Sequence, residues 1–156
     1  MEISVMRGKL LFLLVISLLV SFTGRAAGEH KIRMIIDGHV IHGSLDNSRV
    51  AGEIFSMLPF SLSPLTELGG REKYGNLPDS VKSRGQYTDQ YSPGMIGYWS
   101  PGNQLAFYYH DDGQRIPSPG IIPVGTFDSS TFSLLKDATI IRIEQDSTSG
   151  DNSYHE

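Results

Sequence analysis

The chain of 156 residues contains no cysteine, which excludes disulfide bonds, thiolate-bound metals and a cysteine nucleophile. Positive charge is scarce, because 13 lysines and arginines stand against 17 aspartates and glutamates, for a net charge of −4. Nucleic-acid binding needs a basic face, so we expect no nucleic-acid partner. Charged residues make up only 19% of the chain, too few for a charged disordered polymer. The length suits one domain of roughly 100–150 residues.

Long apolar runs are absent except near the N-terminus, at residues 10–22. Arg7 and Lys9 precede this run, and small residues follow it up to Gly28. A basic start, a short apolar run and a small-residue exit are typical of a secretory signal peptide, here residues 1–26. An uncleaved anchor is the alternative, but thirteen residues make a helix of about 20 Å, shorter than a hydrocarbon core of about 30 Å. We therefore expect no stable membrane anchor.

Outside residues 1–26 the chain has ten basic and sixteen acidic residues, a net charge of −6. It offers no cysteine for a lipid anchor, so we expect an exported, periplasmic or extracellular monomer. One domain is predicted over residues 30–145. The tail, residues 146–156, has no aliphatic residue and is predicted to be disordered.

The domain opens with a predicted β-hairpin. Residues 31–36 and 39–45 read as strands, and Asp37-Gly38 between them is typical of a tight hairpin turn. The capping residues 46–48 then precede apolar residues at three- and four-residue spacing, which predicts one amphipathic helix that ends before Pro59.

The rest of the domain reads as short strands separated by glycine- and proline-rich turns. Pro101 and Gly102 suit the centre of a type II turn, and residues 129–135 suit one helical turn. Strands are predicted at residues 71–78, 95–99, 104–109, 121–127 and 139–143. Many short strands with one or two short helices predict a mainly β fold, a closed antiparallel barrel.

Several segments carry a resemblance to a known family, two of them most strongly. Residues 91–99 read Tyr-Ser-Pro-Gly-Met-Ile-Gly-Tyr-Trp, and residues 102–109 read Gly-Asn-Gln-Leu-Ala-Phe-Tyr-Tyr. Together with Ser-Pro-Gly at 118–120 and Pro-Val-Gly-Thr-Phe-Asp at 123–128, they resemble the small bacterial cyclophilin-like domain family over about residues 31–144. This resemblance implies an eight-stranded cyclophilin-type barrel with helices closing its ends.

Cyclophilins are peptidyl-prolyl isomerases, so the resemblance raises that activity as one alternative. Isomerisation has a barrier of about 18–20 kcal/mol, which an enzyme lowers with an apolar proline pocket and an arginine near the proline nitrogen. The Phe-His-Arg strand of true cyclophilins is absent here, and residues 102–107 are only a loose counterpart of their later Gly-Ser-Gln-Phe-Phe-Ile segment. An isomerase would have to use an arginine such as Arg71 or Arg84.

Aromatic residues are concentrated in the second half of the domain, where seven of the fifteen fall within residues 87–109. Strand alternation predicts that Trp99 and Tyr98 face opposite sides, as do Tyr108 and Phe107. One set would pack the core, and the other would form an amphipathic groove for a peptide or small ligand. The predicted ligand-binding residues are Arg84, Gln86, Tyr87, Tyr91, Trp99, Gln104 and Phe107.

Metal and cofactor chemistry finds little support in the sequence. His110, Asp111 and Asp112 are adjacent, but adjacent strand residues face opposite sides, and hard cations need more carboxylates. We therefore expect no metal and no cofactor, and a binding module rather than an efficient enzyme. A scaffold within a larger assembly is the third alternative.

Overall fold

The computed structural model describes residues 28–147. The predicted signal peptide, 1–26, and all but the first two residues of the predicted tail lie outside the described residues. The strands are His30–Ile36 (β1), His39–Leu45 (β2), Phe60–Leu62 (β3), Thr66–Leu68 (β4), Glu72–Asn76 (β5), Met95–Trp99 (β6), Gln104–Tyr108 (β7), Ile122–Phe127 (β8) and Ile141–Gln145 (β9). The helices are Arg49–Ser56 (α1) and Phe132–Asp137 (α2), with short 3-10 turns at Ser100–Gly102 (η1) and Ser129–Thr131 (η2).

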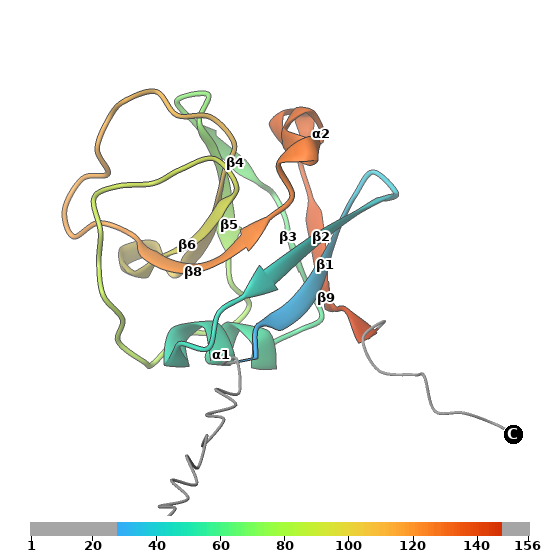
Figure 1. The fold of residues 1–156 in the computed structure, drawn as a ribbon, viewed down its shortest axis with the longest axis horizontal. Helices are drawn as coiled ribbons and strands as arrows, with labels where there is room; N and C mark the ends of the chain where they lie inside the picture. The colour runs from blue at the N-terminus through green and yellow to red at the C-terminus, as the bar shows by residue number, and fades with distance from the viewer. Residues whose placement is uncertain (1–27, 148–156) are drawn as a thin grey trace, which may run out of the picture.

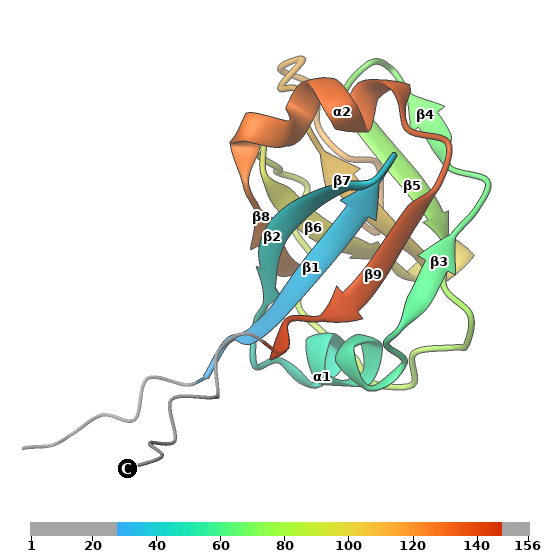
Figure 2. The same ribbon diagram turned by 90° about the vertical axis from the view of Figure 1, so that its right-hand side faces the viewer.

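All nine strands form one antiparallel sheet in the order β3-β9-β1-β2-β8-β6-β7-β5-β4. The sheet curls on itself, and α1 and α2 lie at its opposite ends (Figures 1 and 2). The mainly β, antiparallel prediction is confirmed.

The prediction of a closed barrel is wrong, because β3 and β4 remain the two edges of the sheet. The chain passes between them through Pro64, which has no N–H to donate to a strand ladder. Just after it, the Leu65 N–H donates to the Thr139 carbonyl oxygen at 2.9 Å, which keeps this segment on the β9 side. The result is a curled half-barrel.

The hairpin at the start of the domain is confirmed. β1 and β2 pair with Met34 opposite Ile41. Asp37 and Gly38 both adopt positive φ, 49° and 79°, as a two-residue turn of the type I′ kind requires.

The predicted helix is α1, and it begins where the capping residues predicted. The Ser48 side-chain oxygen accepts a hydrogen bond from the Ala51 N–H at 3.1 Å. Val50 and Ile54 are buried against the curled sheet, so α1 covers one of its ends. No helix within residues 28–147 is long and apolar enough to cross a membrane.

The turn between β6 and β7 differs from the predicted type II turn. Residues 100–102 form η1, and the left-handed residue is Asn103, with φ 51°, rather than Gly102. Asparagine tolerates this conformation, and both ends of the Asn103 amide are anchored. Its Oδ1 accepts from the Tyr98 hydroxyl at 3.1 Å, and its Nδ2 donates to the Asp79 carbonyl oxygen at 2.9 Å.

Strand alternation divides the aromatic residues between two clusters, as predicted. Tyr98 and Phe107 belong to the main core inside the curl. Tyr108 belongs to a second cluster with Trp99 packed against it, on the other face of β6 and β7. Residues of this second cluster line a cavity.

Candidate functional site

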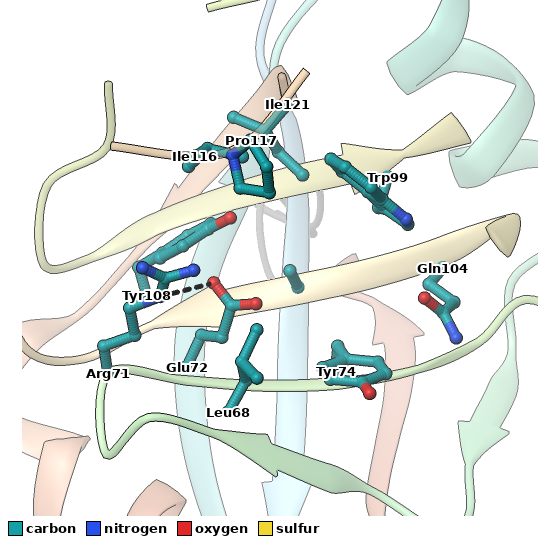
Figure 3. Close-up of a pocket in the computed structure, with 11 residues that line it drawn as sticks. Leu68, Arg71, Glu72, Tyr74, Trp99, Gln104, Tyr108, Ile116, Pro117 and Ile121 are labelled. Carbon is teal, nitrogen blue, oxygen red and sulfur yellow. Dashed lines mark ion pairs between the residues drawn. The ribbon is translucent and has the colours of Figure 1, made fainter. Parts of the chain in front are cut away.

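A cavity of about 180 Å³ lies on the face of β5, β6 and β7 that points away from the main core. An engineered protein cavity of roughly 150 Å³ holds benzene, so this space accommodates one aromatic ring or one apolar side chain. Its walls are mostly apolar, formed by Trp99, Ala106, Tyr108, Ile116, Pro117 and Ile121 (Figure 3).

Register and alternation explain why these side chains meet. Glu72 pairs with Tyr108 and Tyr74 pairs with Ala106, so alternate residues of β5 and β7 line one face. Ala106 lies between Gln104 and Tyr108 on that face of β7. Its small side chain leaves the space that the larger neighbours enclose.

The roof of the cavity is residues 116–121, which cross over from the loop after β7. The Ile116 N–H donates to the Asp89 carbonyl oxygen at 2.8 Å. Ile121 and Thr88 exchange two backbone hydrogen bonds, both at 2.9 Å. The roof is therefore anchored to residues 88–89 by backbone hydrogen bonds.

Two oppositely charged side chains are buried at one end of the cavity (Figure 3). Arg71 and Glu72 are 7% and 6% exposed, and Arg71 Nε lies 3.5 Å from Glu72 Oε2. On its other side, Arg71 Nη1 lies 3.7 Å from Asp112 Oδ2. The guanidinium also stands over the Tyr91 ring, 5.4 Å from its centroid, a cation–π arrangement.

Tyr91 links this charged end to the aromatic wall. Its ring stacks on Tyr108 with centroids 4.6 Å apart, and its hydroxyl donates to Asp112 Oδ1. The Asp112 N–H in turn donates to the Tyr91 hydroxyl at 3.2 Å. The hydrogen bond from Tyr91 is the main reason that the pKa of Asp112 is lowered, and burial, followed by the same hydrogen bond, raises the pKa of Tyr91.

The ion pair does not satisfy the hydrogen-bonding needs of its members. Among the residues that the structure describes, Arg71 Nε and Glu72 Oε2 are buried without a hydrogen-bond partner. Burial raises the pKa of Glu72, and this effect outweighs the lowering by Arg71 and by a hydrogen bond from Tyr108. The pKa of the Tyr108 hydroxyl is raised as well, first by burial and then by the charge of Glu72.

The structure distributes the predicted ligand-binding residues over several places. Trp99 and Gln104 line the cavity, and Tyr91 supports it from behind Tyr108. The Phe107 side chain is buried in the main core. The remaining three, Arg84, Gln86 and Tyr87, lie outside the cavity lining, and the Tyr87 hydroxyl is 2.8 Å from Ser100 Oγ.

Sequence reasoning missed Glu72 and the roof. Arg71 was named only as one of two candidate arginines, and it does reach the cavity. The alternation of Gln104, Ala106 and Tyr108 along β7 could have predicted that these side chains share one face, which forms the floor of the cavity beneath residues 116–121. Nothing local in the sequence indicated that residues 116–121 fold back over that face.

No group of three or more histidine and acidic side chains that could hold a metal ion occurs within residues 28–147. His110 and Asp111 are exposed beside the partly buried Asp112. Asp112 directs its carboxylate to Tyr91 and Arg71 instead.

Comparison with known proteins gives one sequence match and several structural ones. The sequence model described as "Cyclophilin-like family" matches residues 34–144. A hypothetical protein from Archaeoglobus fulgidus, known from its solution structure, is similar with a TM-score of 0.61 and 18% identity, covering 79% of this chain and 99% of that one. McbB, determined in complex with tryptophan, is similar with a TM-score of 0.55 and 15% identity. That match covers 76% of this chain and 46% of McbB. No curated protein matches the sequence.

Proposed function

The chain belongs to the cyclophilin-like family, and from that premise we propose that it is a binding module whose cavity takes one apolar side chain of a peptide or one small apolar ligand. The observation that carries the proposal is the cavity itself, about 180 Å³ with largely apolar walls and two buried charges at one end. Small-ligand sites typically combine apolar walls with a few placed polar groups.

The position of Trp99 and Gln104 at the end opposite the charged pair supports this proposal (Figure 3). Both side chains are partly exposed, so a ligand has an aromatic surface and an amide at the mouth of the cavity. McbB, which shares the fold, has been determined in complex with tryptophan, itself an apolar ring joined to polar groups.

Trp99 makes the proposal testable, because it is the single tryptophan of the chain and lines the cavity. We expect benzyl alcohol and N-acetyl-leucinamide to change the tryptophan fluorescence saturably. Ala106→Leu fills the cavity and should abolish this change, while the protein stays folded by circular dichroism. Val40→Leu, at an exposed position of β2, is the matched control and should bind as the wild type does. Undiminished binding by Ala106→Leu, or no binding by the wild type, would refute the proposed site.

A weak prolyl isomerase is the second candidate, and one observation favours it: Arg71 borders an apolar cavity large enough for a proline ring. Against it, Arg71 lies within 4 Å of two carboxylates, Glu72 and Asp112, which compete for the guanidinium. A protease-coupled assay with a proline peptide separates the candidates. Arg84→Ala serves as the control, since Arg84 is exposed outside the cavity. A rate above background that Arg71→Ala removes and Arg84→Ala keeps would establish the isomerase.

We also propose that the module works outside the cytoplasm as a soluble monomer. The basic, apolar and small-residue order of residues 1–26 supports export. N-terminal sequencing of the protein from its native host should begin at residue 27, and size-exclusion chromatography should give the mass of one chain. A protein that retains residues 1–26 would contradict the export proposal.

A further inference from the structure

The Glu72 carboxylate lines the cavity, is buried, and is incompletely hydrogen-bonded by the protein. Figure 3 shows this carboxylate directed from β5 into the space between Arg71, Leu68 and the roof. The side chain is 6% exposed. Its Oε2 atom faces Arg71 Nε at 3.5 Å and accepts no hydrogen bond from any residue that the structure describes. A buried carboxylate oxygen without a donor is unfavourable, so a donor brought by a ligand would be stabilised there.

The surrounding charges determine which kind of donor fits. One cation, Arg71, lies between two carboxylates, Glu72 and Asp112, so the charged end of the cavity carries an excess of acidic groups. Arg71 is already engaged on its other sides by Asp112 and by the Tyr91 ring.

The next cation along β5 does not relieve this excess. Lys73 points to the opposite face, where its Nζ donates to the Ala138 carbonyl oxygen at 3.1 Å. A cationic N–H donor therefore suits the Glu72 carboxylate better than an anion does.

We propose that Glu72 determines the specificity of the cavity, and that the ligand is an apolar group joined to a protonated amine, either a free amine or the first residue of a peptide. The inference rests on the proposed function, since it assigns the chemistry of the same cavity. The apolar part of the ligand lies among Trp99, Ala106 and Ile121, and the ammonium donates to Glu72.

The experiment compares three probes that share one ring: benzylamine, benzyl alcohol and benzoate. Binding is followed by Trp99 fluorescence and by calorimetry near pH 7. We expect benzylamine to bind more tightly than benzyl alcohol by about tenfold or more, as a charge-assisted hydrogen bond in a buried site allows. Benzoate should bind most weakly. Leucinamide against N-acetyl-leucinamide then shows whether a peptide N-terminus is accepted, because acetylation removes the ammonium.

Two variants assign the effect to Glu72. Glu72→Gln keeps the size of the side chain and removes its charge, so it should lose the preference for benzylamine and keep the binding of benzyl alcohol. Asp37→Asn removes the same charge at the exposed hairpin turn and should keep the preference.

Equal binding of the amine and the alcohol, a preference for benzoate, or a preference that survives Glu72→Gln would overturn the role of Glu72 while leaving the cavity intact. Failure of benzyl alcohol and every other probe to bind the wild type would instead overturn the proposed function.

Discussion

Gly97 of β6 lies directly against Ile121 of the roof. A β-carbon on residue 97 would come within 2.4 Å of Ile121 Cγ1, far inside van der Waals contact. Ile121 is almost fully buried and lines the cavity. The roof can therefore pack on β6 only because residue 97 has no side chain, and the shape of the cavity depends on that absence.

We expect Gly97→Ala to displace Ile121 and to weaken both folding and ligand binding. Overpacking of a filled site typically costs about 1–3 kcal/mol. Urea unfolding should show the loss of stability, and the fluorescence response of Trp99 to benzyl alcohol should shrink. A variant as stable as the wild type with full probe binding would show that the roof moves freely.

Gly52→Ala provides the matched control for that substitution. Gly52 lies within α1, and a β-carbon there meets no atom within 4 Å. Alanine should raise the free energy of unfolding by about 0.5–1 kcal/mol, because glycine loses more conformational freedom in a helix. Probe binding should not change, since α1 lies away from the cavity lining.

The stability of the protein should depend on pH through Glu72. Burial raises the pKa of Glu72 in the folded state, so the folded protein holds this proton more tightly than the unfolded chain does. The stabilisation is complete below the unfolded-state pKa of about 4.3 and is lost as the pH rises through the folded-state pKa. The free energy of unfolding of Glu72→Gln minus that of the wild type should therefore be larger at pH 7 than at pH 4, because only the wild type loses this stabilisation as the pH rises. Urea unfolding of both proteins at pH 4 and at pH 7 measures the two values. Equal values at the two pHs would contradict the prediction.

Tyr91→Phe tests how the charged end is held together. Phenylalanine keeps the ring that stacks on Tyr108 and lies under Arg71, and it removes only the hydroxyl that donates to Asp112. Because that hydrogen bond is the main cause of the lowered pKa of Asp112, the pKa should rise toward its ordinary value. Carboxyl resonances in an NMR titration report the pKa of Asp112.

Glu144 is the internal reference, because its lowered pKa comes from Arg142 and Arg33 and should stay unchanged. An unmoved Asp112 would assign its low pKa to other groups.

Local elements of this fold were predictable because their causes are local. Asp37 and Gly38 satisfy the hairpin turn with their own positive φ, and Ser48 caps α1 with its own side chain. At the turn between β6 and β7 the same reasoning failed. The Pro101-Gly102 pair predicted a type II turn, but contacts with Tyr98 and Asp79 hold Asn103 in the left-handed conformation instead.

The sequence by itself determined the mainly β character, the opening hairpin, the capped helix and the division of the aromatic residues between two faces. Each of these depends on residues a few positions apart. Only the tertiary structure decided that the sheet stays open between β3 and β4, and that residues 116–121 cover Ala106. It also decided that Arg71 and Glu72 are buried at the end of that space, beside the distant residues Tyr108 and Asp112. These features join segments far apart in the chain, so they follow from packing and desolvation rather than from any local pattern.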